Sequence, residues 1–265
     1  MRLVIAAVLV GLLPFEALAE QSALRKLETG DDSKGWEAVG RLNLGKKGFC
    51  TGAMIAPNLV LTAAHCLFDK TSGERVPTAD IQFLAGWRNG RAVAYRNARR
   101  AVAHPDYQFE SADQMHRVAY DLALVELDQP IRLPSIKPFE TDVHPAKGDE
   151  VGIVSYARDR SEAPSLQEVC EVLGRQPGVL VLSCNVDFGS SGAPIFSMRG
   201  GVARVVSVVS AKADMTGQQV ALATTLEEPL EVLREALDNE RAVFNKPMPT
   251  IVPKATTGGA KFVKP

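Results

Sequence analysis

The sequence has few of the residues that build metal sites. Only four histidines and four cysteines occur in 265 residues, and neither a Cys-x-x-Cys nor a His-x-x-x-His spacing is present. The common structural zinc sites need such closely spaced ligands. The sequence therefore gives no basis for a metal site, and we expect the protein to work without a metal or an organic cofactor.

Long apolar runs are also scarce. Residues 3–13 form the one extended apolar run, and it is too short to span a bilayer comfortably. Arg2 precedes this run and Ala17-Leu18-Ala19 follows it, an arrangement typical of a secretory signal peptide with a small-residue cleavage site. We therefore expect residues 1–19 to be removed and the mature protein to have no transmembrane segment. It should be secreted, into a periplasm or the extracellular space.

Acidic residues are missing from the end of the chain. Residues 241–265 contain five basic residues and no acid, although the net charge of the whole chain is −1. The remaining body is therefore acidic, which disfavours binding to nucleic acid. We expect the proline-rich tail to be a solvated, disordered end, and the protein to be a monomer with no nucleic-acid partner.

The four cysteines fit export to an oxidising compartment, where an even number favours disulfides. Three pairings are formally possible. Local pairing of Cys50 with Cys66 and of Cys170 with Cys184 closes loops of about 15 residues, each worth roughly 3 kcal/mol in the chain-entropy model. We expect this local pairing, and buried free thiols are the alternative.

Apolar segments with helical spacing are rare, and short apolar stretches separated by turns dominate. This pattern of short apolar stretches predicts an all-β fold, as an antiparallel barrel or sandwich. The first half has predicted strands at 39–44, 49–55, 59–62, 81–85, 91–95, 99–103 and 122–127. The second half has predicted strands at 150–156, 167–173, 179–184, 193–197, 202–210 and 220–224. The repeated texture indicates two similar β units, followed by a helix that contains Leu230, Leu233 and Leu237.

One stretch carries the features of a nucleophile. Gly189-Ser190-Ser191-Gly192-Ala193-Pro194 places small residues between two apolar runs. Glycines allow sharp turns that leave N–H groups exposed, and an acyl-transfer nucleophile needs a hydroxyl beside such donors. A plain tight loop would show the same composition, so the stretch alone does not identify a site.

Two other residues are candidate partners. His65 directly follows a predicted buried strand, and Asp121 stands at the entrance to an almost wholly apolar one. A carboxylate in that position is costly unless it is hydrogen-bonded or paired. Each residue alone has a structural alternative, and Asp106 and Asp113 compete with Asp121 for the acidic role.

Together these segments resemble the chymotrypsin-like (trypsin-like) serine peptidase superfamily, and are closest in character to its bacterial V8-like members. The run from Phe49 to Ile55 and Leu61-Thr62-Ala63-Ala64-His65-Cys66 are similar to the histidine motif with its flanking disulfide. His104-Pro105-Asp106-Tyr107 and the segment 120–127 are similar to the aspartate region, and 189–194 to the glycine-flanked serine. The resemblance runs from about residue 36 to 237, in the family order His, Asp, Ser.

The resemblance implies a fold and a division of the chain. The fold is two antiparallel six-stranded β-barrels with a C-terminal helix. The segments are a signal peptide at 1–19, a propeptide or flexible N-terminus at 20–35, a first barrel at 36–134, a connector at 135–148, a second barrel at 149–226, a helix at 227–240 and a disordered tail at 241–265.

The resemblance also implies roles for individual residues. Ser191 is the nucleophile, His65 the general base and Asp121 the residue that orients the imidazole. The backbone N–H groups of Gly189 and Ser191 form the oxyanion hole. Ser210 matches a serine that supports the aspartate and borders the substrate cleft.

The residues at the expected specificity positions differ from those of the best-known members of the superfamily. Asn185 falls at the base of the specificity pocket, where members that prefer Lys or Arg carry aspartate. Val209 stands where glutamyl peptidases of the V8 type place a histidine. We therefore expect a neutral, modestly sized pocket.

The activation residues depart as well. Ser190 precedes the nucleophile, where trypsin-like members commonly carry an aspartate that pairs with a freshly cut N-terminus. No sequence like Ile-Val-Gly-Gly precedes the first strand, so activation by that ion pair is not expected. An α/β-hydrolase is excluded because its serine precedes its acid and histidine, and because Ala193 replaces the last glycine of Gly-x-Ser-x-Gly.

The resemblance thus implies a secreted serine endopeptidase that cleaves protein or peptide substrates through an acyl-enzyme. The alternative is a catalytically inactive secreted binding protein on the same fold.

Overall fold

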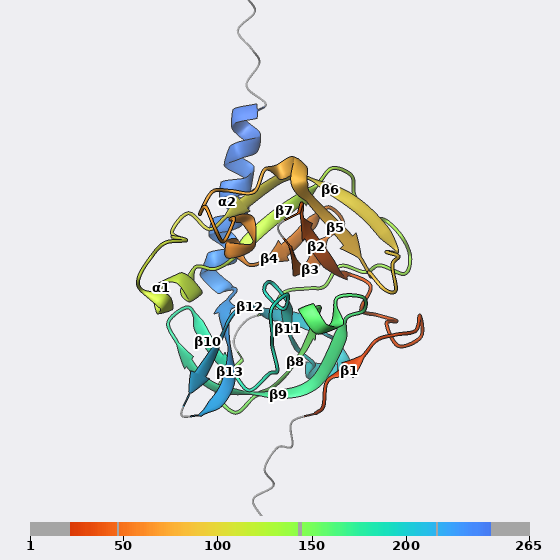
Figure 1. Cartoon of the computed structure of the whole chain (residues 1–265), viewed down its shortest axis with the longest axis vertical. Helices are drawn as coiled ribbons and strands as arrows, with labels where there is room; N and C mark the ends of the chain where they lie inside the picture. Colours follow the sequence, from red (N-terminus) through yellow and green to blue (C-terminus); the bar gives the residue numbers. More distant parts are fainter. Residues whose placement is uncertain (1–21, 47, 143–144, 216, 245–265) are drawn as a thin grey trace, which may run out of the picture.

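The computed structural model describes residues 22–46, 48–142, 145–215 and 217–244, and the side chains as far as residue 239. The predicted signal peptide and the tail beyond residue 244 lie outside this part of the chain. Two β-barrels lie one above the other in Figure 1, and a long helix runs along the upper one.

The first barrel is a closed, antiparallel ring of six strands in the order β2-β3-β4-β7-β6-β5. Its strands are β2 (Val39–Leu44), β3 (Phe49–Ala56), β4 (Leu59–Thr62), β5 (Ile81–Ala85), β6 (Ala94–Ala103) and β7 (Ala123–Leu127). β7 is buried at every position, because one side faces the barrel interior and the other is covered by neighbouring elements.

The second barrel has the order β9-β10-β13-β12-β11-β8, and pairing of β8 with β9 closes the ring. Its strands are β8 (Glu150–Ser155), β9 (Ser165–Gln176), β10 (Val179–Leu182), β11 (Pro194–Ser197), β12 (Arg204–Met215) and β13 (Gln218–Thr225). The predicted fold of two antiparallel six-stranded barrels with a C-terminal helix is therefore confirmed.

The segment before the first barrel packs against the second barrel. β1 (Arg25–Lys26) pairs with β9, Leu27 is fully buried, and the Ser22 hydroxyl accepts a hydrogen bond from the N–H of Val169 at 2.8 Å. The segment that the sequence assigns to a propeptide or flexible end thus adds an edge strand to β9.

Other local differences follow from context. Residues 91–95 do not form a strand of their own, because β6 begins at Ala94 and continues to Ala103 with a register shift between Ala98 and Arg100. The short helix α1 (Gln114–Ala119) is capped by the Asp113 carboxylate, which accepts from the N–H of His116. With only 6 residues, α1 is too short to show a helical spacing of apolar residues in the sequence.

The last helix, α2 (Glu227–Phe244), begins before Pro229 and extends past the predicted end at residue 240. Proline is tolerated there because the first turn of a helix lacks intrahelical acceptors for its N–H groups. Single turns of 3₁₀-helix, η1 (Ala64–Leu67), η2 (Thr78–Asp80), η3 (Arg158–Arg160) and η4 (Arg199–Gly201), complete the elements.

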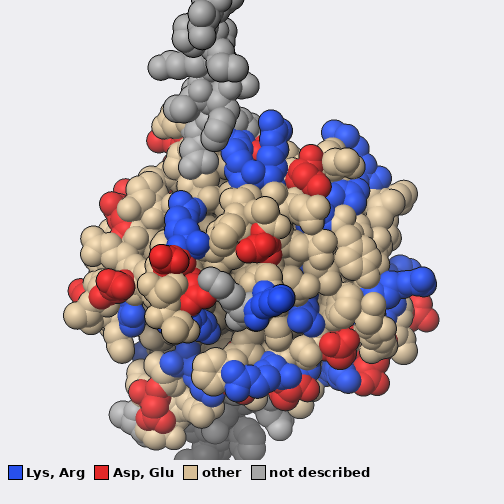
Figure 2. Space-filling model, turned by 45° about the horizontal axis from the view of Figure 1, so that its top comes forward, with Lys and Arg blue, Asp and Glu red and all other residues tan. Residues whose placement is uncertain are grey.

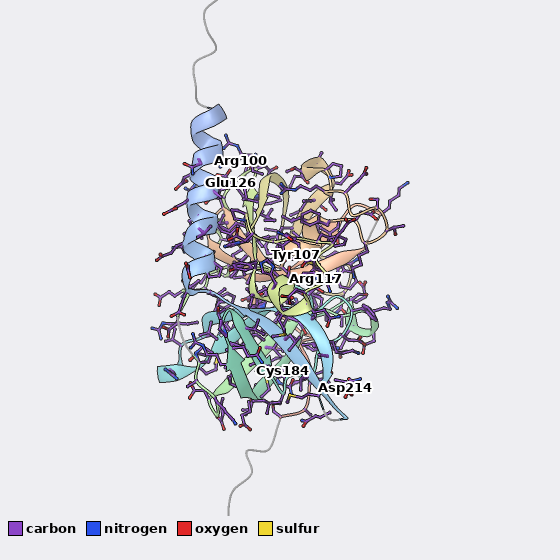
Figure 3. The ribbon with its side chains drawn as sticks, turned by 90° about the vertical axis from the view of Figure 1, so that its left-hand side faces the viewer. Arg100, Tyr107, Arg117, Glu126, Cys184 and Asp214 are labelled. Carbon is purple, nitrogen blue, oxygen red and sulfur yellow. A yellow bond between two sulfur atoms is a disulfide. The ribbon has the colours of Figure 1, made fainter. Side chains whose placement is uncertain are left out.

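A buried ion pair joins α2 to the first barrel. The Arg100 guanidinium on β6 donates to Glu126 Oε2 on β7 at 2.7 Å and to the carbonyl of Leu237 on α2 at 2.9 Å. Figure 3 shows Arg100 and Glu126 beside this helix. The helix follows the second barrel in sequence but is anchored on the first.

One hydrophobic cluster extends from the first barrel across the junction into the second, and a separate cluster fills the second barrel. Trp36, Phe139 and Phe196 form an aromatic cluster at their junction, with ring centroids 4.7–6.1 Å apart. Basic and acidic side chains are interspersed on the face shown in Figure 2. None of the helices within the described chain combines enough length with enough apolar character for a membrane span.

Candidate active site

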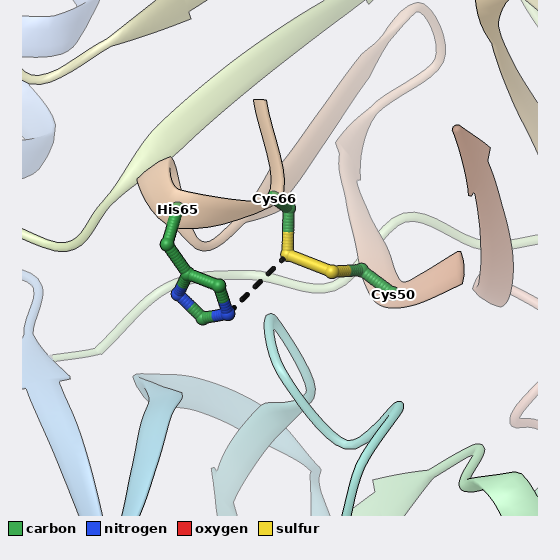
Figure 4. Close-up of side chains that lie close together, drawn as sticks. All are labelled: Cys50, His65 and Cys66. Atoms are coloured by element: carbon green, nitrogen blue, oxygen red, sulfur yellow. Dashed lines mark hydrogen bonds between the residues drawn. A yellow bond between two sulfur atoms is a disulfide. The ribbon is translucent and has the colours of Figure 1, made fainter. Parts of the chain in front are cut away.

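His65 lies on η1, directly after β4, and contacts Asp121 through two atoms. Its Nδ1 is 2.6 Å from Asp121 Oδ2, and its backbone N–H donates to Asp121 Oδ1 at 2.8 Å. The Cys50–Cys66 disulfide anchors the same turn to β3, and His65 Nε2 faces it, 3.9 Å from Cys66 Sγ (Figure 4). The hydrogen bond to Asp121 therefore fixes the imidazole at Nδ1, and Nε2 points away from the carboxylate.

The Asp121 carboxylate is buried at the start of β7, with 3% of the residue exposed. Ser210 on β12 donates to Oδ2 at 2.5 Å, so the carboxylate accepts from three donors among the described residues. Three hydrogen bonds from fixed donors satisfy the polar atoms of a carboxylate that would otherwise be costly to bury. Since Ser210 belongs to the second barrel, both barrels take part in holding this group.

Ser191 lies on the loop that leads into β11. Its carbonyl accepts from the N–H of Thr51 at 2.8 Å, and the N–H of Gly192 donates to the carbonyl of Val209 at 2.8 Å. Gly192 has φ +77°, and a Cβ there would lie 2.1 Å from the Thr62 hydroxyl. Only glycine fits this position, so the loop is locked between the barrels directly beside Ser191.

Two backbone donors beside Ser191 are left open. The carbonyl of Phe188 accepts from the N–H of Arg158 at 2.7 Å, so in a trans peptide the N–H of Gly189 points the opposite way. Neither this N–H nor that of Ser191 has an acceptor among the described residues. Gly189 has φ +100°, which allows this orientation. Two unpaired N–H groups beside a hydroxyl have the arrangement that stabilises an oxyanion.

His65, Ser191 and Gly189 line one open cavity of about 390 Å³. The Cys50–Cys66 disulfide and Phe49 form its wall on the side of the first barrel, and Phe188 and Arg158 on the side of the second. The Ser191 hydroxyl makes no hydrogen bond with another described residue. Catalytic hydrogen bonds are often long before substrate binds, so the arrangement is compatible with proton transfer once the cavity is filled.

Asn185 does not line this cavity. It is exposed, and with Lys212 and Gln218 it lines a separate cavity of about 220 Å³. Lys212 Nζ lies 3.3 Å from Asp187 Oδ1. The N–H of Phe188, and then Lys212, hold the pKa of Asp187 below its usual range. The two charges offset each other beside this cavity.

The competing acids lie elsewhere. Asp113 caps α1, and Asp106 is exposed beside His104. His104 is buried, and this burial lowers the pKa of its imidazole. Tyr107 packs against Phe68, and burial together with the Asp121 charge raises its pKa far above the usual range.

Cys50, His65 and Cys66 have potential ligand atoms within 4.8 Å of one another. Both sulfur atoms belong to the disulfide, so neither offers the thiolate that a metal needs. The second disulfide joins Cys170 to Cys184. The local pairing expected from the sequence is thus present.

Thr51 is a positioning residue that the sequence did not single out. It is fully buried on β3, and its hydroxyl donates to the carbonyl of Gly189 at 2.9 Å and accepts from the N–H of Tyr156 at 3.1 Å. With the bond from its own N–H to Ser191, it ties the first barrel to the serine loop. The one available signal was a polar residue within an otherwise apolar strand.

Comparison with known proteins agrees with this geometry. The chain is 28% identical to a glutamyl endopeptidase of Bacillus licheniformis over 150 residues. This matched segment covers 56% of this chain and 45% of that protein. The chain is 37% identical over 82 residues to a trypsin of Simulium vittatum, covering 31% of this chain and 28% of that one. The chain thus spans less than half the length of these curated relatives.

A solved structure of Glu endopeptidase has the same fold, with a TM-score of 0.66 over 85% of this chain and 99% of that one, at 15% identity. The family described as the trypsin-like peptidase domain matches residues 50–203. This segment begins at the disulfide cysteine before His65 and extends past the Ser191 loop. The chain therefore belongs to the trypsin-like peptidase family.

Proposed function

We propose that the protein is an exported serine endopeptidase that uses Ser191, His65 and Asp121 as its catalytic triad. One observation carries this proposal: the hydrogen-bonded chain from Ser210 through Asp121 to His65 ends in the cavity that Ser191 lines. A structural histidine would not need a buried carboxylate on one nitrogen and an open cavity around the ring.

The contacts support a two-step acyl transfer. Ser191 Oγ attacks the carbonyl carbon of the substrate while His65 Nε2 takes its proton. The imidazolium then gives this proton to the leaving amine as the C–N bond breaks, and an ester to Ser191 remains. Water attacks this ester by the same route and restores the hydroxyl. The N–H groups of Gly189 and Ser191 stabilise the oxygen anion in both steps.

Asp121 keeps the imidazole in the required tautomer. Because Oδ2 accepts from Nδ1, the proton of neutral His65 stays on Nδ1, and Nε2 is free to act as the base. The negative charge also stabilises the imidazolium that forms during each step. The backbone bond to Oδ1 prevents the carboxylate from turning away.

For specificity we propose a modestly sized, uncharged side chain before the scissile bond. This proposal rests on the sequence match of Asn185. In the structure Asn185 lines a cavity that Ser191 does not line, and the Lys212 charge at that cavity is offset by Asp187. The relatives named above include a glutamyl endopeptidase and a trypsin, so acidic and basic preferences are the alternatives. Cleavage of a peptide library would decide, and a profile dominated by Glu or by Arg would contradict this assignment.

Export is the second part of the proposal. Both disulfides connect cysteines that would stay reduced in a cytosol, and the sequence of residues 1–19 is typical of a cleaved signal. N-terminal sequencing of the protein from the periplasm and from the culture medium tests this part. A chain recovered from the cytosol with Met1 in place would refute it.

A fluorophosphonate probe tests the catalytic assignment directly. The mature wild-type protein should label, and Ser191→Ala should not. Ser135→Ala is the matched control because it removes the hydroxyl of an exposed serine that does not line the Ser191 cavity. A folded wild-type protein that neither labels nor cleaves casein would favour a binding protein on the same fold.

A further inference from the structure

A buried arginine lies beneath the serine loop. Arg160, on η3, has 10% of its side chain exposed, and its Nε has no hydrogen-bond partner among the described residues. Its guanidinium contacts Ser155 Oγ at 3.2 Å, Ser190 Oγ at 3.4 Å and the exposed carboxylate of Asp159 at 3.3 Å. Arginine remains charged in proteins, so a cation is held directly behind the nucleophile.

Ser190 is the contact point between this cation and the loop. Its hydroxyl is fully buried and accepts from the N–H of Asp187 at 3.3 Å as well as from Arg160. With both lone pairs used, its own proton points to the Tyr156 carbonyl or to Ser155 Oγ, at 3.3 and 3.4 Å. Every hydrogen-bonding position of Ser190 is thus occupied.

The η3 segment, which carries Arg160, contacts the serine loop at a second point. The N–H of Arg158 holds the carbonyl of Phe188 at 2.7 Å, which directs the N–H of Gly189 toward the cavity. Arg160 holds Ser190 two residues farther along. Phe188 and Ser190 flank Gly189, so η3 sets the orientation of the peptide that carries an oxyanion donor.

The described part of the N-terminal segment, from residue 22 on, lies on the second barrel and not beside Ser190. Ser22 is hydrogen-bonded to Val169, and Leu27 is fully buried after β1. β1 lies on β9, in the lower part of Figure 1, below the junction of the barrels. Among the described residues, the cation that contacts the residue before the nucleophile therefore comes from the middle of the chain.

We propose that Arg160 is a positioning residue that holds the Ser190–Ser191 loop in its reactive conformation, so that the site forms without cleavage of the chain. It takes the place that the freshly cut N-terminal ammonium has in activated trypsin-like members, with Ser190 in place of their aspartate. The inference rests on the proposed peptidase function and deepens it.

Replacement of Arg160 tests this role. Arg160→Met should slow fluorophosphonate labelling and lower kcat by about tenfold or more with little change in KM, because a misplaced oxyanion donor acts in the transition state. Complete loss of one donor costs about 10²–10³. Arg160→Lys keeps the positive charge but lacks the planar guanidinium with its several donors, so its labelling rate should be intermediate. Arg175→Met, which removes an exposed partner of Glu227 far from the site, should label at the wild-type rate.

Chemical rescue separates positioning from mere folding. In Arg160→Ala, millimolar guanidinium should restore part of the lost labelling rate, and methylammonium should restore less. A slow variant that guanidinium does not rescue, and that also loses near-UV circular dichroism, would show a structural role only and overturn the inference.

A blocked N-terminus provides the second arm. A mature chain fused behind an uncleavable folded tag should label as fast as the untagged chain. If only a newly cut N-terminus gave labelling, or if Arg160→Met labelled at the wild-type rate, the inference would fail while the peptidase function stood. Absence of labelling in every wild-type form would instead refute the proposed function.

Discussion

Replacing Asp121 with asparagine should invert the proton arrangement on His65. The carboxylate accepts from three donors, namely the backbone N–H of His65 at Oδ1, and His65 Nδ1 and the Ser210 hydroxyl at Oδ2. Asparagine offers one oxygen and one NH₂ group. The backbone N–H cannot turn, whereas the hydroxyl can rotate and the imidazole can change tautomer. We therefore expect the oxygen at the Oδ1 position and the NH₂ group facing Nδ1.

That orientation makes Nδ1 an acceptor and leaves the proton on Nε2, which can no longer take the proton of Ser191. The expected loss in kcat is about 10⁴, the factor typical of this change in a Ser-His-Asp triad. The labelling rate of Ser191 should fall in parallel. Stability should fall by only about 1–3 kcal/mol, because the shape of the side chain is kept.

Fluorophosphonate labelling under pseudo-first-order conditions measures this loss without a known substrate. Ser210→Ala is the control, since it removes one donor from Asp121 without reversing the tautomer and should cost far less in rate. Asp121→Asn with a labelling rate within tenfold of the wild type would refute the assigned role. Urea unfolding of both variants shows whether the fold is retained.

Three further outcomes follow from the structure. Gly189→Ala should strongly reduce labelling because a Cβ at φ +100° would lie 2.6 Å from an aromatic ring, whereas Gly200→Ala, at φ +68° with nothing within 4 Å, should leave labelling unchanged. His104 is buried with a lowered pKa, so below about pH 6.5 the unfolded chain takes up a proton that the folded chain resists. Stability in urea should therefore fall as the pH drops below that value, and less steeply in His104→Gln. Arg100→Met should cost about 3–5 kcal/mol because it takes the Arg100 charge away from the buried Glu126 carboxylate, and addition of Glu126→Gln should recover part of this loss; equal costs for the single and double variants would contradict it.

Much of the fold and the candidate site can be read from the sequence because the motifs there are local. Leu61-Thr62-Ala63-Ala64-His65 is a buried strand followed directly by a histidine, and the structure has β4 followed by η1 at this place. Asp121 before an apolar strand is satisfied by three hydrogen bonds, as a buried carboxylate requires. The local pattern predicts the buried strand before His65 and the need of Asp121 for partners, but these partners come from positions 56 and 89 residues away.

Long-range contacts set the features that the sequence did not reveal. Residues 91–95 have the composition of a separate strand, but pairing with β5 and β7 extends β6 through Ala103 instead. Arg160 lies in a charged stretch that is typical of a solvated loop, and only the fold places it beneath Ser190. No spacing in the chain connects these residues, which are 30 positions apart.

For the proposed peptidase, the path of α2 also bears on when the protein first becomes able to cut another chain. Synthesis and export proceed from the N-terminus, so His65 and Asp121 emerge well before Ser191. The last described helix then returns from the second barrel to the first, where Arg100 holds the carbonyl of Leu237. A partly made chain holds only some of these contacts. In the proposed peptidase, the candidate site would therefore stay incomplete until the second barrel has been made.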